Sequence, residues 1–317
     1  MKTIGFPISH KENEHRRALL PSDIARISHP ECLYFEYGYG EACGFTNEDY
    51  LSTGANIASR AEVLKKSVLC DPKIGDAEYL ESLNKQTVFG WIHAVQNRDI
   101  TDKLVNNSLT AYAWEDMFEG GRHVFWRNNE LAGEAAVLHA FQCYGKMPYE
   151  TKVAVIGRGN TARGAIKILN MLGADIMVYD RTTEKLLREE IGNYDAIINC
   201  VLWDVRRRDH IIYKEDLLKM KRDSIIVDVS CDRNGAIETS IPTTLDAPTY
   251  VVDKVLHYAV DHTPTIFHKT FTKNNSKILV NYINELIEEN IGSVLSAAKI
   301  VENGTILDER INKFQNR

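Results

Sequence analysis

The sequence predicts an α/β protein with two Rossmann-like domains that are separated by a cleft, the C-terminal helix returning to the N-terminal domain. Three observations predict this class. The chain has 317 residues, which is too long for one ordinary domain and suits two. Strand-like runs alternate with helical segments, as in parallel sheets. A glycine-rich turn at 157–162 follows a strand and begins a helix.

Short apolar runs predict the strands of the first domain, and amphipathic stretches between them predict its helices. We expect strands at 3–6, 33–37, 67–70, 88–92 and 109–113, and helices at 47–53 and 61–65. This alternation predicts a parallel sheet.

The second domain begins with an alanine-rich helix over 128–145. The strand at 152–157, the helix at 161–172 and the strand at 175–180 then form a βαβ unit, and further strands are expected at 196–201 and 224–229. A last helix is expected over 278–301, docked against the first domain. We therefore expect a substrate domain at 1–128 and 273–317, and an NAD(P)-binding Rossmann domain at 129–272.

Composition narrows the class of protein. The 38 basic and 44 acidic residues give a net charge of −6, which disfavours nucleic acid and anionic membranes as partners. No stretch approaches the roughly 20 apolar residues that a membrane helix needs, and the N-terminus lacks a signal peptide. The six cysteines form no CxxC pair, so we expect no metal site. A reduced, cytoplasmic, metal-free protein is the simplest interpretation.

The turn after the strand at 152–157 has the G-x-G-x-x-A form of a dinucleotide fingerprint. Gly157 permits a tight turn, Gly159 lets the backbone approach a pyrophosphate, and the small Ala162 lets the helix pack close to the strand. The N–H groups at the start of that helix favour phosphate.

Two signals at the end of the second strand conflict over the cofactor. Asp180 stands 23 positions after Gly157, near where an acidic residue holds the adenosine ribose of NAD. Arg181, Thr182 and Thr183 follow, and a cation with two hydroxyl groups can hold the 2′-phosphate of NADP. Alternatively, Asp180 stabilises the turn and Arg181 stacks on the adenine. We favour NADP(H). The candidate cofactor contacts are Gly157, Gly159, Asn160, Thr161, Ala162, Asp180, Arg181, Thr182, Val201 and His262.

The segment Glu12–Pro21 (ENEHRRALLP) resembles the N-terminal signature of the alanine dehydrogenase and saccharopine dehydrogenase superfamily. In that superfamily an arginine in this stretch meets the carboxylate of a keto acid, and Arg16 fills that position. The chemistry fits, because a planar guanidinium pairs with a carboxylate as a fork.

Two further segments resemble strands of the superfamily that end in catalytic residues. Lys73 ends the run Cys70–Lys73 (CDPK), and His93 ends the run Gly90–His93 (GWIH). In parallel sheets ligands gather at such strand ends. Histidine suits proton transfer near neutral pH, and a lysine can orient a carbonyl or move a proton.

In the second domain, Ile226–Gly235 resembles the family's V-D-x-x-x-D-x-x-G turn, whose second aspartate is Asp232 here. This resemblance implies a catalytic role for Asp232. His262 departs from alanine dehydrogenases, which carry asparagine there, and the surrounding D-H-x-P segment looks more like lysine-forming saccharopine dehydrogenases.

Over its full length the chain most resembles the N5-(carboxyethyl)ornithine synthase family. That resemblance implies NADPH-dependent joining of pyruvate to the side-chain amine of ornithine or lysine, in a homo-oligomer that is a dimer or a tetramer. Arg16 and Lys73 would bind the pyruvate carboxylate, and Lys73, His93 and Asp232 would be catalytic. Glu115, Asp116 and Asp232 are candidates to receive the α-amine. An alanine dehydrogenase that uses ammonia, and a non-catalytic nucleotide-binding subunit like that of transhydrogenase, are the alternatives.

Overall fold

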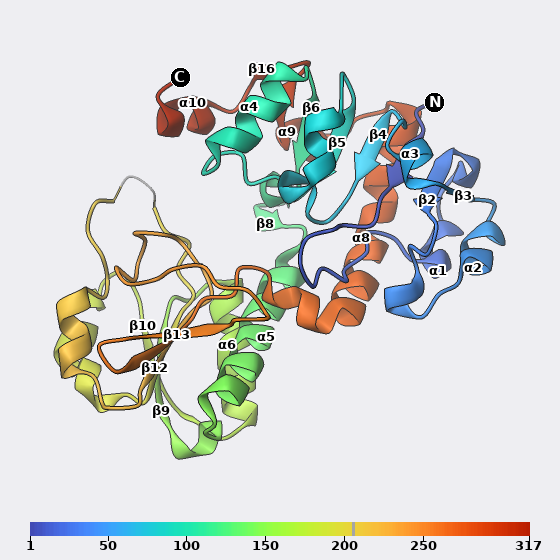
Figure 1. Ribbon diagram of the computed structural model, residues 1–317. Coiled ribbons are helices and arrows are strands. Elements are labelled where there is room, and N and C mark those ends of the chain that lie inside the picture. Colours follow the sequence, from blue (N-terminus) through green and yellow to red (C-terminus); the bar gives the residue numbers. More distant parts are fainter. Residues whose placement is uncertain (205–206) are drawn as a thin grey trace. The chain divides into compact units, whose positions relative to one another are not determined.

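The computed structural model describes residues 1–204 and 207–317 and divides into two compact units. Unit 1 comprises Met1–Phe125 and His268–Arg317, and unit 2 comprises Trp126–Phe267 (Figure 1). Both are α/β units built on a mainly parallel sheet, and the C-terminal segment returns to the first. Unit 2 begins and ends a few residues before the boundaries expected at 129 and 272, because long helices begin at Trp126 and His268.

Unit 1 contains an eight-stranded sheet in the order β16-β15-β6-β5-β4-β1-β2-β3, in which β1 to β6 are parallel. These six strands are β1 (Ile4–Phe6), β2 (Leu33–Glu36), β3 (Asn56–Ala58), β4 (Val68–Cys70), β5 (Thr87–Gly90) and β6 (Thr110–Ala113). The order reverses between β1 and β4, and ligands of open α/β sheets bind outside the carboxyl ends of strands at such a point.

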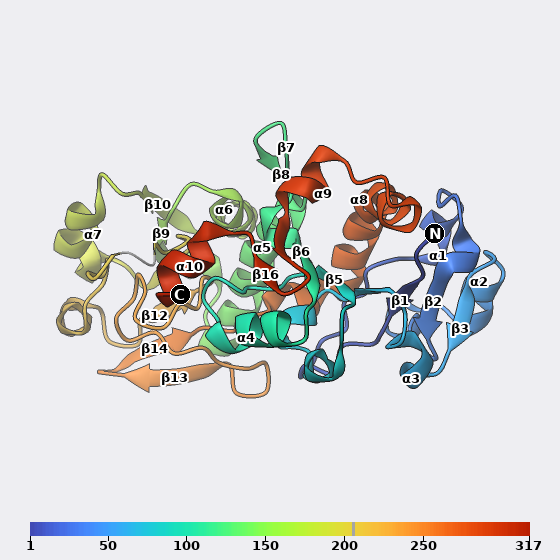
Figure 2. The same ribbon diagram turned by 90° about the horizontal axis from the view of Figure 1, so that it is seen from above.

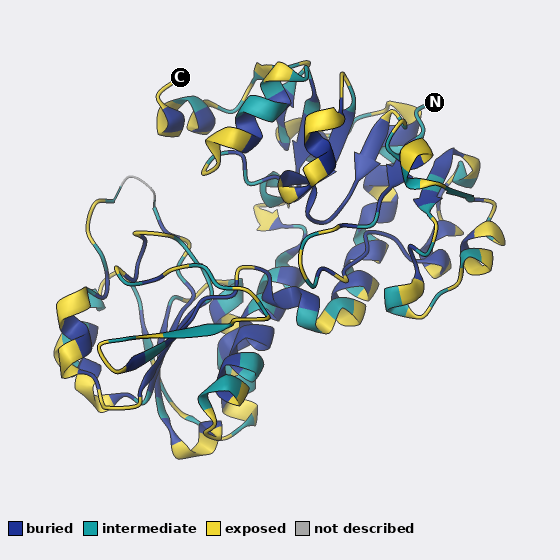
Figure 3. Ribbon diagram, viewed as in Figure 1, coloured by how far each residue is buried: buried dark blue, intermediate teal, exposed yellow. Residues whose placement is uncertain are grey.

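The strands at the centre of this sheet, β1, β4 and β5, are buried along their whole length (Figure 3). Parallel strands covered on both faces read as continuous apolar runs, which is why the sequence revealed them. The edge strand β3 is only half-buried, and the sequence did not indicate it. The helices of this part are α1 (Pro21–Ile24), α2 (Asn47–Leu51), α3 (Arg60–Val63) and α4 (Arg98–Asn106), and β7 (Phe118–Glu119) and β8 (Arg122–His123) form a hairpin that Figure 2 shows.

The C-terminal segment corrects one sequence prediction. The helix expected over 278–301 is in fact α8 (His268–Glu288), which ends because Glu289 adopts a left-handed φ of 57°. After α9 (Ser293–Ala297), the residues Lys299–Glu302 form β15, which pairs antiparallel with β6. The strand pairing therefore overrides the helical periodicity there. The segment closes with β16 (Thr305–Ile306) and α10 (Glu309–Gln315).

Buried hydrogen bonds join α8 to the N-terminal part of unit 1. Ser276 Oγ accepts the Leu20 N–H at 2.9 Å and donates to Asp23 Oδ2 at 2.6 Å. Thr272 Oγ1 accepts the Arg17 N–H at 3.0 Å. Two backbone donors of the segment before α1 are thus satisfied by side chains of α8.

Unit 2 contains a six-stranded sheet in the order β10-β9-β11-β12-β14-β13, parallel except for β13. Its strands are β9 (Lys152–Ile156), β10 (Asp175–Tyr179), β11 (Ala196–Asn199), β12 (Ile225–Asp228), β13 (Thr249–Val252) and β14 (Val255–Tyr258), and its helices are α5 (Trp126–Tyr144), α6 (Asn160–Met171) and α7 (Glu184–Glu190). The order reverses between β9 and β11, so the fingerprint turn after β9 lies at the switch point.

Helices α5 and α6 pack at very close range. A Cβ added to Gly133 would lie 2.0 Å from Thr161 O, and one added to Gly164 would lie 1.9 Å from Glu130 O. Only hydrogen fits at these two positions. The backbone of α5 therefore fixes the placement of α6 and of the turn that precedes it.

The described residues contain neither a membrane-spanning helix nor a metal-binding cluster. No helix in them is long and apolar enough to cross a membrane. No group of three or more histidine, cysteine, aspartate or glutamate side chains in the same residues could hold a metal ion.

Candidate active site

Arg16 lies in the loop after β1 and is held by a residue that the sequence analysis did not single out. Glu14 accepts from Arg16 Nε at 2.8 Å and from Nη2 at 2.5 Å, in a fork-like pair in which both side chains are buried. The guanidinium also lies 4.8 Å from the ring centre of Phe271 in α8. Glu14 thus orients Arg16 and leaves the Nη1 nitrogen outside the pair. The signal for Glu14 was its place two residues before Arg16 in the same motif.

Arg16 and Lys73 together hold the pKa of Glu14 at about 2, against a desolvation effect that would raise it. A carboxyl whose pKa is lowered on folding stabilises the protein above its unfolded pKa of 4.5 and loses that contribution as the pH falls toward 2. Glu14 is therefore a buried anion at neutral pH.

Glu14→Gln is expected to destabilise the protein by about 3 kcal/mol at neutral pH, because the buried Arg16 loses its anionic partner. The difference in free energy of unfolding between the variant and wild type should become smaller as the pH falls below 4.5, because protonation of Glu14 removes the same charge from wild type. Urea unfolding at a series of pH values measures it. A gap that stays constant with pH would contradict the role given to the Glu14 charge.

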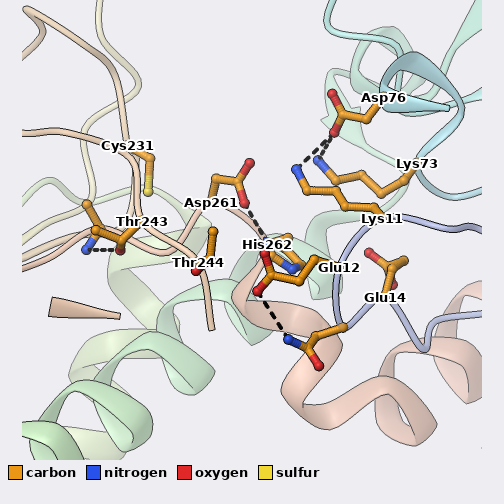
Figure 4. Close-up of polar contacts among 12 residues, drawn as sticks. Lys11, Glu12, Glu14, Lys73, Asp76, Cys231, Thr243, Thr244, Asp261 and His262 are labelled. Carbon is orange, nitrogen blue, oxygen red and sulfur yellow. Dashed lines mark hydrogen bonds and ion pairs between the residues drawn. The ribbon is translucent and has the colours of Figure 1, made fainter. Parts of the chain in front are cut away.

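Lys73 follows β4, is buried, and shares an acidic partner with a second, partly exposed lysine. Its Nζ lies 2.9 Å from Asp76 Oδ2, and Lys11 Nζ lies 3.0 Å from the same oxygen (Figure 4). The two ammonium groups lower the pKa of Asp76 to about 2, although partial burial opposes this. Asp76 is thus a permanent anion that fixes the Lys73 side chain. Nothing in the sequence motifs indicated Asp76 or Lys11.

The loop that carries Lys73 contacts the loop that carries His93 through backbone atoms. Asp71 Oδ1 accepts the Lys73 N–H at 2.8 Å, and burial raises the pKa of the Asp71 carboxyl to about 6. Gly75 N–H donates to Trp91 O at 3.1 Å, and a Cβ at Gly75 would lie 2.1 Å from Ile92 O. The carboxyl ends of β4 and β5 therefore present Lys73 and His93 from two loops in backbone contact.

His93 has a left-handed φ of 55°, which is uncommon for a residue other than glycine. Its ring stacks on Trp91, with ring centres 6.2 Å apart. Glu115, which follows β6, supports this backbone: Oε1 accepts the His93 N–H at 2.5 Å and Oε2 accepts the Ile92 N–H at 3.2 Å. Burial raises the pKa of Glu115 to about 7. The Glu115 carboxyl thus holds the backbone of His93 through hydrogen bonds to two successive N–H groups.

In unit 2, the fingerprint turn combines a left-handed glycine with open space at the start of α6. Gly157 has φ 113°, and a Cβ there would lie 3.3 Å from Cys200 O at the end of β11. A Cβ at Gly159 would meet no atom within 4 Å, and Gly159 is the N-cap of α6 with no side-chain cap. Ala162 is fully buried, while Asn160 and Thr161 are partly exposed in the first turn. Open space beside Gly159 fits a pyrophosphate at the start of α6.

Gly159→Ala is expected to weaken dinucleotide binding by about tenfold or more, because the new methyl group occupies the space through which a pyrophosphate approaches. The protein itself tolerates the methyl group, so the free energy of unfolding should change by less than about 1 kcal/mol. Fluorescence titration and urea unfolding measure the two quantities. Unchanged affinity would contradict the assignment of this turn.

Asp180, the acidic residue that follows β10, already has protein partners for both of its carboxylate oxygens. Asp180 Oδ2 lies 2.9 Å from Arg158 Nε of the fingerprint turn, and Oδ1 accepts the hydroxyl and N–H of Thr182 at 2.6 and 3.0 Å. Arg181 is exposed beside it. Two arginines thus flank the one carboxylate, and Arg158 was not among the residues singled out from sequence.

The remaining predicted residues of unit 2 lie at the carboxyl ends of its strands. Asp232 follows β12, and its Oδ2 atom is buried with no hydrogen-bond partner in 1–204 and 207–317. Burial and the nearby Asp228 carboxylate raise the pKa of Asp232 to about 6. His262 follows β14, is buried, and contacts Asp261 Oδ1 through Nδ1 at 2.5 Å. Val201 O, after β11, accepts from the Ser230 hydroxyl at 2.6 Å.

The structure thus brings the predicted residues together in two sets. Arg16, Lys73, His93 and Glu115 belong to loops at the carboxyl edge of the first sheet, and the fingerprint turn, Asp180, Asp232 and His262 belong to the same edge of the second. These features define a protein of two Rossmann-like α/β units, one with a glycine-rich fingerprint turn and one in which arginine, lysine, histidine and glutamate side chains lie at the carboxyl edge of the sheet.

Comparisons with known proteins agree with this class. The family models described as alanine dehydrogenase/PNT, N-terminal domain, and alanine dehydrogenase/PNT, C-terminal domain, match residues 5–124 and 181–311. The N(5)-(carboxyethyl)ornithine synthase of Clostridium botulinum is 30% identical over 88% of this chain and 93% of its own. The alanine dehydrogenase of Halomonas elongata is 29% identical over 85% and 83%. A solved structure of L-alanine dehydrogenase superposes with a TM-score of 0.83 at 21% identity over 99% of both chains.

The chain belongs to the alanine dehydrogenase/PNT family, and N(5)-(carboxyethyl)ornithine synthases are among its relatives.

Proposed function

We propose that this protein is an NADPH-dependent oxidoreductase that condenses pyruvate with the side-chain amine of ornithine, or of lysine, and reduces the resulting imine. The product from ornithine is N5-(1-carboxyethyl)ornithine, and lysine would give the corresponding N6 product. The observation that carries this proposal is the connected set Glu14, Arg16, Lys73 and Asp76 at the switch point of the first sheet. It combines a guanidinium whose Nη1 lies outside the pair with Glu14 and a lysine that Asp76 fixes. The 30% identity to N(5)-(carboxyethyl)ornithine synthase supports the choice of amine.

Arg16 and Lys73 bind the carboxylate of pyruvate in this proposal. Glu14 occupies one edge of the guanidinium, so Arg16 meets the carboxylate with Nη1. The ammonium of Lys73, held by Asp76, places a second positive charge on the keto acid. Both groups polarise the keto carbon toward attack by the neutral amine.

Lys73 and His93 transfer protons in this proposal, while the carbinolamine loses water to give the imine. Asp232 in unit 2, with its pKa near 6, is a further proton-transferring group. The nicotinamide cofactor supplies the hydride that reduces the imine. Because both oxygens of Glu115 accept backbone N–H groups, we assign Glu115 to positioning His93. Asp116, another sequence candidate for the α-amine, forms an ion pair in which its Oδ2 atom lies 2.7 Å from Arg310 Nη2.

A substrate panel tests this function. Purified protein should oxidise NADPH when both pyruvate and ornithine or lysine are present, and the product should carry a carboxyethyl group by mass spectrometry. Fast oxidation with ammonia and none with ornithine would instead make the protein an alanine dehydrogenase. Dinucleotide binding without turnover of any amine would indicate a non-catalytic nucleotide-binding subunit.

Arg181→Ala is expected to weaken NADPH binding by about tenfold while it leaves NADH binding nearly unchanged, since only NADPH carries the 2′-phosphate that an arginine pairs with. Asp180 is already occupied by Arg158 and Thr182, which favours the phosphate-bearing cofactor. Titration of both cofactors measures the preference. Lys185→Ala, an exposed cation on α7, is the matched control. Equal losses for both cofactors would refute the role of Arg181.

A further inference from the structure

We propose that a cavity in unit 1 is the subsite for the α-amino and α-carboxylate groups of the amine substrate, with Asp76 binding the α-ammonium and Arg98 the α-carboxylate. This inference rests on the function proposed above, and it names the part of the molecule that recognises an α-amino acid. The cavity has a volume of about 420 Å³ and is lined by residues 75–78, 96–100 and Lys103.

The first argument is position. One wall of the cavity begins at Gly75, two residues after Lys73, and the other begins at Gln96, three residues after His93. The two loops touch where Gly75 N–H donates to Trp91 O. The cavity therefore lies between two loops, one that continues from Lys73 and one that continues from His93. These two residues are the proposed proton-transferring groups. A chain whose terminal amine reacts beside Lys73 can place its other end there.

The second argument is the geometry of Asp76. Both lysines bind the same oxygen, Oδ2, and in Figure 4 the other oxygen points away from the two ammonium groups. Oδ1 accepts no hydrogen bond from the described residues. The side chain is 35% exposed, so a ligand can reach it. Asp76 thus joins the keto-acid site to the cavity: one oxygen orients Lys73, and the other is available to a cation.

The third argument is the mixture of charges on the cavity wall. An α-amino acid carries an ammonium and a carboxylate on one carbon, so its subsite needs an anion and a cation. Arg98 supplies the cation. Its contacts within the described chain are weak, with Asp102 at 4.0 Å and Gln315 O at 3.5 Å. Lys103, also on the wall, is held by Glu81 at 2.7 Å. Arg98 is therefore the cation available for a carboxylate.

The test compares ornithine with two analogues that keep the reacting amine. 5-Aminopentanoate lacks the α-amine, and butane-1,4-diamine lacks the α-carboxylate. In wild type, kcat/KM should be higher for ornithine than for either. Asp76→Asn should lower the preference over 5-aminopentanoate by about tenfold or more, and Arg98→Gln should do the same for the preference over the diamine.

The ratio of kcat/KM for ornithine to kcat/KM for an analogue separates recognition of the α-groups from a structural effect on Lys73. Loss of the Asp76 charge also loosens Lys73, but this lowers kcat/KM for all three amines together and leaves the ratio unchanged. Asp175→Asn, an exposed aspartate at the start of β10, is the matched control and should leave the ratio unchanged. Wild-type ratios in both Asp76→Asn and Arg98→Gln would overturn the proposal, even if ornithine is the substrate.

Calorimetric titration with ornithine distinguishes failure of this subsite from failure of the proposed function. If wild type turns over no amine but binds ornithine, and Asp76→Asn weakens that binding by about tenfold, the subsite stands and the proposed reaction fails. If wild type neither turns over nor binds ornithine or lysine, both fail. If ornithine binds wild type and Asp76→Asn equally, the subsite assignment fails alone.

Discussion

Replacement of His93 by asparagine is expected to lower kcat by about 10²–10⁴-fold, because the side chain that exchanges protons near neutral pH is removed. Asparagine is the substitution of choice, since the backbone of residue 93 is left-handed and asparagine tolerates that conformation better than alanine does. The N–H that Glu115 accepts is retained in the variant. The loss should therefore report the imidazole and not a rearranged loop.

The control for this variant is cofactor affinity. NADPH titration should give the same dissociation constant as wild type, because the fingerprint turn belongs to unit 2 and His93 to unit 1. Steady-state rates of NADPH oxidation with pyruvate and ornithine measure the loss. Turnover within about twofold of wild type would remove His93 from the proton-transferring set.

Replacement of Gly164 by alanine is expected to lower the free energy of unfolding by about 2–4 kcal/mol. The new methyl group would lie 1.9 Å from Glu130 O and 2.7 Å from the carbonyl carbon, both backbone atoms of α5. Backbone atoms cannot rotate away as a side chain can, so α5 and α6 must separate. The gain in helix propensity, about 1 kcal/mol, offsets only part of this cost.

Urea unfolding of this variant and of Asn170→Ala measures the effect. Asn170 is exposed on the same helix, so its replacement gains helix propensity without a clash and should be neutral or slightly stabilising. If Gly164→Ala were as stable as Asn170→Ala, the close packing of α5 on α6 would not describe the protein in solution.

The sequence predicted best the elements whose residues are buried on both faces. The strands β1, β4, β9 and β11 appear as continuous apolar runs, and their alternation with helices indicated two parallel sheets. Elements that depend on a distant partner were missed. Lys299–Glu302 follows a helical pattern and became β15 only because β6 offers an edge for pairing. The half-buried β3 has no apolar run to reveal it.

The candidate site divides in the same way. Arg16, Lys73, His93 and the fingerprint glycines were found because each belongs to a local motif at the end of a predicted strand. Their partners could not be found. Asp76 reaches Lys73 and Lys11 only through the fold of its loop, and Arg158 meets Asp180 only because β9 and β10 are neighbours. Tertiary geometry, not sequence spacing, places such charges together.

The return of the C-terminal segment to unit 1 has a consequence for synthesis on the ribosome. When Met1–Phe125 has emerged, the hydroxyl groups of Thr272 and Ser276 that accept the N–H groups of Arg17 and Leu20 have not yet been synthesised. The strand β15, which pairs with the edge of β6, is also still missing. Unit 2 is contiguous and can fold before the chain is released. The sheet of unit 1 begins to be translated first but is completed only after unit 2, so nascent chains expose the β6 edge until Lys299–Glu302 has left the exit tunnel.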